Sequence, residues 1–296
     1  MSDEQLFPVN LELRESDASG EVASGLSHAP GGMFLLFVQE LAARGEPSGA
    51  ATIVHDAGGH GGRYVELARS LAARGWAVSL PDLRGHGRSE GARGHCAGEN
   101  EVVRDLGEVQ AHLAYMAPDV PRVLIGDGLG ALHALAAASA DPDVRALVLL
   151  APLLAPRFEP PTAPGGLKRL FKKVGPTSPG RTLFDGELLT SDAEQARAWE
   201  EDELAHDTIT LQAIEQAERA GAGAAERLDR LGASVLVLQG AQDRLGDPES
   251  VRALSGEGVE VRLFDGMRHD LLHETGRAEV ITGVVDWLGE RVGEAG

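Results

Sequence analysis

The sequence predicts an α/β protein built on a mostly parallel sheet with helices on both faces. Between residues 50 and 150, short apolar runs alternate with segments of helical character, which is typical of a parallel sheet. The runs carry few charges, as expected for strands that are buried on both faces. With 296 residues and 43% hydrophobic content, the chain can bury its core as one large domain or as one domain with an insertion.

Eight apolar runs are expected to form strands, because each is short and most are rich in β-branched or aromatic residues. They are Val9–Arg14, Met33–Leu41, Ala51–His55, Trp76–Leu80, Arg122–Ile125, Ala146–Leu150, Ser234–Gln239 and Val259–Phe264. Four segments are expected to be helical from apolar spacing or from an Ala/Leu-rich composition. They are Tyr64–Leu71, Val102–Met116, Leu129–Leu135 and Ile281–Leu288. Gly75 suits the end of the first helix, and Pro118 breaks the second.

The stretch from Arg122 to Leu135 predicts a strand, a tight turn and a helix. Gly126 and Gly130 flank the turn, where small residues let a strand and a helix pack closely. Gly128 lies at the apex. A glycine there adopts positive φ at little cost, because it has no Cβ. The apex therefore suits a sharp turn, but it carries no side chain.

The alternation of strands and helices stops between residues 151 and 229. Five prolines open this stretch, which then becomes helical before the next apolar run. We therefore predict a core of residues 1–153 and 230–296, with an inserted cap of residues 154–229. Every lysine of the chain lies in the predicted cap, in the segment Lys168–Lys173. If this segment is helical, its basic residues lie on the side opposite an apolar stripe.

Composition excludes some classes of function. Acidic residues outnumber basic ones 46 to 27, and the formal charge of −19 repels phosphate backbones and anionic membrane surfaces. Nucleic acid is therefore not an expected partner. The single cysteine, Cys96, excludes an intramolecular disulfide and suits a reducing compartment. Because the chain has no basic leader and no apolar run of ~18 residues, we expect a cytoplasmic protein without stable membrane insertion.

Several motifs follow one another in an order typical of one family. His55 precedes a Gly58–Tyr64 loop, and further motifs lie at Asp82–Ser89, Gly126–Gly130, Gly240–Asp243 and Asp265–His269. Together they resemble the monoacylglycerol lipase and lysophospholipase branch (serine aminopeptidase-like) of the α/β-hydrolase superfamily. The resemblance covers residues 50 to 153 and 185 to the C-terminus. It implies the α/β-hydrolase fold, with carboxylic esters as the substrate class.

The resemblance also implies a catalytic site. Residue by residue, Asp243 matches the family's acid and His269 its base, whereas Gly128 stands at the position of the nucleophilic serine. The backbone N–H groups of Ala57 and Leu129 match the oxyanion-hole donors. This pattern supplies the base and its carboxylate but no attacking hydroxyl group. No cofactor is implied, and no metal-ligand spacing is evident.

Two further residues depart from the family pattern beside the predicted site. Asp56 replaces a usual Gly beside the oxyanion loop, and Asp127 replaces a usual His before the nucleophile. Each places a carboxylate near the position where an oxyanion would form, and like charges oppose that step. Asp127 could in principle be a displaced nucleophile, but it lies one residue before the apex and should point away from the cavity.

Three hypotheses follow. The first is a pseudoenzyme of monoacylglycerol lipase type that binds an acyl or other apolar ligand under its cap. The second is a weak ester hydrolase in which His269 and Asp243 activate water directly, because Gly128 leaves room for it. The third is a regulatory or scaffold protein that acts through the surface of the cap. The basic segment of the cap is expected either to pack its apolar side on the core as a solvated helix or to contact lipid or an acidic partner.

Overall fold

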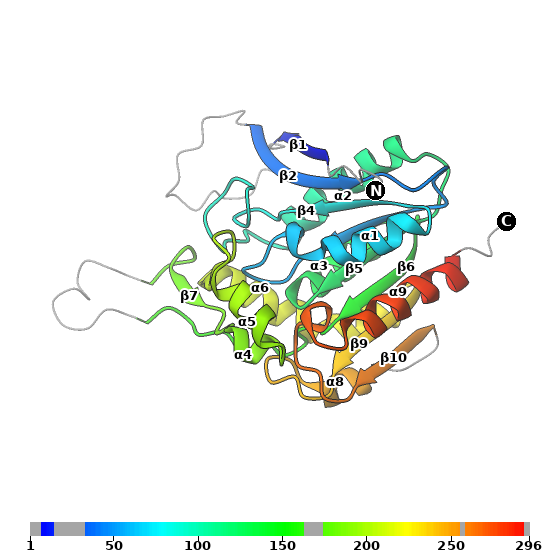
Figure 1. The fold of residues 1–296 in the computed structure, drawn as a ribbon. Helices are drawn as coiled ribbons and strands as arrows, with labels where there is room; N and C mark the ends of the chain where they lie inside the picture. Colours follow the sequence, from blue (N-terminus) through cyan, green and yellow to red (C-terminus); the bar gives the residue numbers. More distant parts are fainter. Residues whose placement is uncertain (1–6, 15–32, 163–173, 255–257, 293–296) are drawn as a thin grey trace.

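The computed structural model describes residues 7–14, 33–162, 174–254 and 258–292. Its centre is a sheet with strand order β1-β2-β4-β3-β5-β6-β9-β10 (Figure 1). The strands are β1 (Phe7–Arg14), β2 (Met33–Leu41), β3 (Gly49–Val54), β4 (Trp76–Pro81), β5 (Arg122–Asp127), β6 (Val144–Leu150), β9 (Ser234–Gly240) and β10 (Val259–Phe264). The six strands β4, β3, β5, β6, β9 and β10 run parallel to one another. Strand β2 is antiparallel to β4, and β1 is antiparallel to β2. The prediction of a mostly parallel sheet is confirmed.

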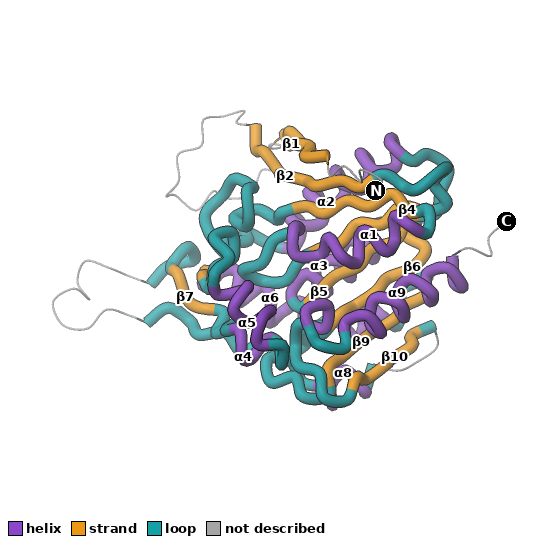
Figure 2. Tube along the Cα trace, viewed as in Figure 1, coloured by secondary structure: helices purple, strands orange, loops and turns teal. Residues whose placement is uncertain are grey.

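Helices cover both faces of the sheet, as predicted (Figure 2). Helices α1 (Val65–Ala73) and α9 (Arg277–Val292) pack in one hydrophobic cluster, and α2 (Glu99–Met116) and α3 (Leu129–Ala140) contribute to a second. Strand β5 supplies side chains to both clusters, because successive residues of a strand point to opposite faces. This explains why the buried strands read as continuous apolar runs rather than as alternating ones.

The chain between β6 and β9 forms smaller elements beside the main sheet (Figure 1). They are β7 (Pro179–Arg181), α4 (Gly186–Leu189), α5 (Ala193–Glu200), β8 (Thr208–Thr210), α6 (Leu211–Ala222) and α7 (Ala224–Leu228). Strands β7 and β8 pair with each other and not with the main sheet, and α6 and α7 pack against α3. The assignment of residues 154–229 as a separate cap stays a prediction. The basic segment Lys168–Lys173 lies outside the described residues.

A few short elements were not predicted. They are the 3-10 turns η1 (Gly61–Tyr64) and η3 (Leu271–His273), the helix α8 (Pro248–Arg252) and the strands β7 and β8. Each is too short to show a period in the sequence. Within the described ranges, no helix combines the length and the apolar character needed to cross a membrane.

Candidate functional site

The sharp turn between β5 and α3 matches the predicted strand, turn and helix. Gly128 joins the two elements with φ +54° and ψ −114°, a conformation that residues with a side chain rarely adopt. Gly130 lies so close to the neighbouring loop that a Cβ on it would be 2.3 Å from the carbonyl oxygen of His55. The glycines of this turn therefore permit both its backbone angle and its close packing.

Two loops that follow adjacent parallel strands bring together the predicted acid and base. Asp243 follows β9 and His269 follows β10, and Nδ1 of His269 lies 2.8 Å from Oδ2 of Asp243. The other oxygen of Asp243 accepts hydrogen bonds from the N–H groups of Leu245 (2.8 Å) and Gly246 (3.0 Å). Burial opposes ionisation of Asp243, but the imidazole and these amides outweigh it and lower the pKa to about 2. The pair has the geometry of an orienting carboxylate and a histidine.

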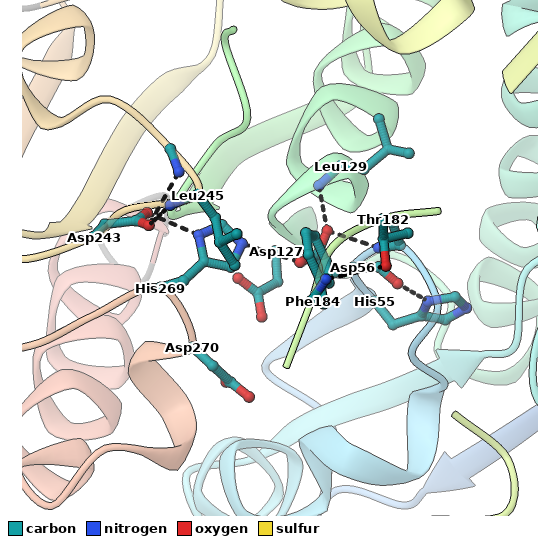
Figure 3. Close-up of polar contacts among 12 residues, drawn as sticks. His55, Asp56, Asp127, Leu129, Thr182, Phe184, Asp243, Leu245, His269 and Asp270 are labelled. Carbon is teal, nitrogen blue, oxygen red and sulfur yellow. Dashed lines mark hydrogen bonds and ion pairs between the residues drawn. The ribbon is translucent and has the colours of Figure 1, made fainter. Parts of the chain in front are cut away.

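The carboxylate of Asp56 fills the predicted oxyanion hole (Figure 3). Its Oδ1 accepts hydrogen bonds from the backbone N–H groups of Ala57 (2.7 Å) and Leu129 (2.6 Å). Its Oδ2 lies 3.0 Å from Nε2 of His269. The two amides that the sequence assigned to an oxyanion thus converge on one oxygen of the protein's own side chain. We refer to these two N–H groups as the amide pair.

Asp56 also occupies the space of the absent side chain at position 128. A Cβ built on Gly128 would lie 2.0 Å from Oδ1 and 2.1 Å from Cγ of Asp56, far inside van der Waals contact. The expectation that Gly128 leaves room for a water is therefore wrong, because a carboxylate already fills that space. Position 128 can carry a side chain only if Asp56 moves.

His269 lies between two carboxylates in a buried setting. Its burial favours the neutral imidazole, but the charges of Asp243 and Asp56 outweigh this and raise the pKa of His269 well above 6.5. The ring of Phe184, which precedes α4, packs against it with a centroid distance of 5.7 Å. The imidazole is therefore held as a cation, with an N–H directed at each carboxylate.

Asp127 is buried behind the turn and does not bond to His269. Its Oδ2 accepts a hydrogen bond from the hydroxyl of Tyr64 (2.9 Å), and no described residue bonds to its Oδ1. Burial raises the pKa of Asp127 well above 3.8, and the nearby charges of Asp270 and Asp56 raise it further. This side chain has the setting of a neutral acid, not of an attacking carboxylate.

Tyr64 is a site residue that sequence reasoning did not select. Besides donating to Asp127, its hydroxyl oxygen accepts a hydrogen bond from the backbone N–H of Asp56 (3.2 Å). It thus connects the loop after β3 to the end of β5. The only signal in the sequence was its place as the last residue of the Gly58–Tyr64 motif.

His55 serves the architecture of the same loop. Its Nδ1 donates to the carbonyl oxygen of Asp56 (2.7 Å), and its Nε2 accepts from the N–H of Leu83 (2.9 Å). Burial lowers the pKa of His55 to about 4, which keeps the ring neutral. Both ring nitrogens of His55 are thus hydrogen-bonded within the protein. Within the described part of the chain, no group of three or more His, Cys, Asp or Glu side chains is placed to hold a metal ion.

Comparison with known proteins agrees with the fold and with these motifs. The monoacylglycerol lipase of Mycolicibacterium smegmatis is 27% identical over 249 residues, which cover 82% of this chain and 89% of the relative. The monoglyceride lipase of Homo sapiens is 28% identical over 281 residues, covering 88% and 89%. The crystal structure of Paleococcus ferrophilus monoacylglycerol lipase matches with a TM-score of 0.72 and 26% identity, covering 86% of this chain and 99% of that one.

A family model described as serine aminopeptidase, S33, matches residues 45–276. This span begins before β3 and ends just before α9, so it includes the turn at Gly128 and the loops that carry Asp243 and His269. The chain therefore belongs to the serine aminopeptidase S33 family and has the α/β-hydrolase fold.

Proposed function

We propose that this chain is a monoacylglycerol lipase-like protein that is inactive as a serine hydrolase and holds an acyl or other apolar ligand beneath its cap. One observation carries the proposal: the carboxylate of Asp56 lies on the amide pair and fills the space of the missing side chain at Gly128. The same contacts remove two requirements of acyl transfer at once.

Acyl-enzyme chemistry needs an attacking hydroxyl group and empty oxyanion donors. Loss of the nucleophile from a comparable triad lowers kcat by about 10⁶-fold. Loss of a single oxyanion donor lowers it by about 10²–10³-fold. Here Oδ1 of Asp56 accepts from both donors, and its negative charge would repel the oxyanion of any ester that entered. Ordinary ester turnover therefore lacks both its nucleophile and its main electrostatic support.

The relatives and the site surroundings support an apolar ligand. Several relatives are monoacylglycerol or monoglyceride lipases. A monoglyceride lipase from Saccharomyces cerevisiae with the same fold was solved with a substrate analogue. In this chain Ala57 and Leu129, whose N–H groups form the amide pair, belong to a hydrophobic cluster. The cluster also includes Phe184 and Leu189, the latter in α4. An acyl chain would find apolar side chains from both the core and the cap here.

Water activation by His269 is less well supported than this proposal. Nε2 of His269 already faces Asp56 at 3.0 Å, and a protonated imidazole accepts no proton from water. The regulatory or scaffold hypothesis concerns the surface of the cap, and no contact of the described residues favours it.

The test is reactivity of the wild-type protein toward a fluorophosphonate probe and short p-nitrophenyl esters. We expect neither labelling nor turnover. The double variant Asp56→Gly/Gly128→Ser, which restores the family's usual residues at both positions, should gain labelling at the introduced hydroxyl group, whereas Gly128→Ser alone should gain little. Asp143→Asn is a matched control for removal of an exposed carboxylate.

Two outcomes would overturn the proposal. Probe labelling of the wild-type chain would reveal a competent nucleophile. Ester turnover that is lost in His269→Ala would instead establish the water mechanism. Ligand binding is tested separately by calorimetry with a non-hydrolysable 1-O-alkylglycerol, and the absence of heat at any chain length would refute the second half of the proposal.

A further inference from the structure

We propose that Asp56 is itself a nucleophile, which accepts an alkyl group from a neutral substrate such as a 1-haloalkane. In this class of substrate a saturated carbon carries a group that leaves as an anion. The site would hydrolyse this substrate to an alcohol through an ester of Asp56. This activity is distinct from the proposed function, which concerns the loss of serine chemistry and the binding of an apolar ligand.

The carboxylate of Asp56 lies where a nucleophile at position 128 would begin. The Cγ of Asp56 lies 2.1 Å from the place where a Cβ of residue 128 would stand, so its carboxylate occupies the start of the usual nucleophile side chain. Its Oδ2 lies 3.0 Å from Nε2 of His269, which in turn bonds to Asp243 at 2.8 Å. Hydrogen bonds thus link a nucleophile, a histidine and an orienting carboxylate. The nucleophile is the carboxylate of Asp56 in place of a serine hydroxyl.

The two carboxylate oxygens of Asp56 have unequal settings. Oδ1 accepts from both members of the amide pair, at 2.6 and 2.7 Å, and is fixed by them. Among the residues that the structure describes, Oδ2 is bonded only to His269, which leaves a lone pair to share. The side chain is 10% exposed, compared with 1% for His269, so it is the more accessible of the two reacting groups.

The same setting selects a saturated carbon over a carbonyl carbon. An ester carbonyl under attack needs donors for its new oxyanion, but the amide pair is already bonded to Oδ1. Displacement at a saturated carbon develops no oxyanion and needs no such donors. A halide leaves as a stable anion, so the step also requires no proton donor.

The first step forms the bond between Oδ2 and carbon while the bond from carbon to the halogen breaks, and the halide leaves with the electron pair. Asp56 becomes a neutral alkyl ester. His269 then faces one carboxylate in place of two, so its pKa falls and it releases its proton to solvent. The neutral imidazole is then able to act as a base.

The second step is hydrolysis of that ester. His269 takes a proton from water, the hydroxide attacks Cγ, and negative charge develops on Oδ1, which already lies on the amide pair. The adduct expels the alkoxide, which takes the proton of the newly added hydroxyl group. Asp56 returns as a carboxylate, His269 keeps the first proton, and the net products are alcohol, halide and one proton. The amide pair thus stabilises an oxyanion of the enzyme and not of the substrate.

The experiment uses 1-bromohexane with the full chain. We expect wild-type protein to release bromide and 1-hexanol, and Asp56→Asn to lose this activity. His269→Gln should stop after the first step, so its intact mass should rise by one hexyl group and peptide mapping should place that group on Asp56. A single turnover in H₂¹⁸O should put ¹⁸O into the Asp56 carboxylate and not into the alcohol.

Asp143→Asn, an exposed substitution on the far loop after α3, should retain wild-type bromide release. A cooperative thermal unfolding transition in each variant shows that it is folded. Absence both of bromide release above the Asp56→Asn level and of the His269→Gln adduct would overturn the proposal. Appearance of ¹⁸O in the alcohol would also overturn it, because water would then have attacked the substrate directly. Neither result bears on ester or fluorophosphonate reactivity, which test the proposed function separately.

Discussion

Introducing a serine at position 128 should destabilise this protein unless Asp56 is removed as well. In the wild-type chain the carboxylate of Asp56 lies within 2.0–2.3 Å of the place where the new Cβ would be. Gly128→Ser must therefore move Asp56 off the amide pair and away from His269. The serine also inherits a φ of +54°, which suits glycine.

The expected loss combines two effects. Holding a residue with a side chain in a rare backbone conformation costs about 1–3 kcal/mol. Separating a buried carboxylate from its charged partner costs about 3–5 kcal/mol. Gly128→Ser should therefore lower the free energy of unfolding by at least about 4 kcal/mol, which lowers Tm by at least about 8 °C in a chain of this size.

A double-mutant cycle measured by urea unfolding separates the clash from other effects. In Asp56→Gly/Gly128→Ser the serine enters vacated space. The double variant should therefore lose about 2–3 kcal/mol less of the free energy of unfolding than the two single variants lose together. Gly45→Ser is the control for backbone conformation, because Gly45 has φ +89° and no atom of the described residues lies within 4 Å of the place where its Cβ would stand. This control should lose only about 1–2 kcal/mol.

Additive free energies in this cycle would refute the reasoning. They would mean that Asp56 and residue 128 do not compete for one space. A Gly128→Ser loss no larger than that of Gly45→Ser would lead to the same conclusion.

Three further predictions concern the buried charges around the turn. Tyr64→Phe should lower the free energy of unfolding by about 1–3 kcal/mol in urea, because the buried Asp127 carboxyl loses its donor; no change would mean that this bond contributes nothing. NMR titration of the imidazole should find His269 still protonated well above pH 6.5, because its pKa is raised. Its contribution to stability is therefore complete below pH 6.5 and is lost as the pH rises through the raised pKa. Asp56→Asn should lower the pKa of His269, and an unchanged titration would contradict the ion pair. Because the pKa of Asp127 is raised, its tendency to ionise opposes folding increasingly as the pH rises from about 4 toward that pKa. Asp127→Asn should therefore raise Tm more at pH 8 than at pH 5. An equal rise in Tm at both pH values would count against a neutral Asp127.

The sequence alone determined the fold and the chemical types present at the site. Apolar runs between helical segments predict a parallel sheet, because only strands covered on both faces are continuously apolar. The places of Gly128, Asp243 and His269 followed from motif order, and each lies where the fold requires, at the end of a parallel strand or just beyond it. The absence of a serine at the apex is likewise a fact of sequence.

Only the tertiary structure decided what occupies the empty position. Asp56 and Gly128 are far apart in sequence, and the charge of Asp56 did not reveal that its side chain lies on the amide pair and bonds to His269. The partner of Asp127, the hydroxyl of Tyr64, was likewise hidden, because it comes from the loop after β3. Such contacts depend on side-chain direction across adjacent loops, which the spacing of residues along a chain does not specify.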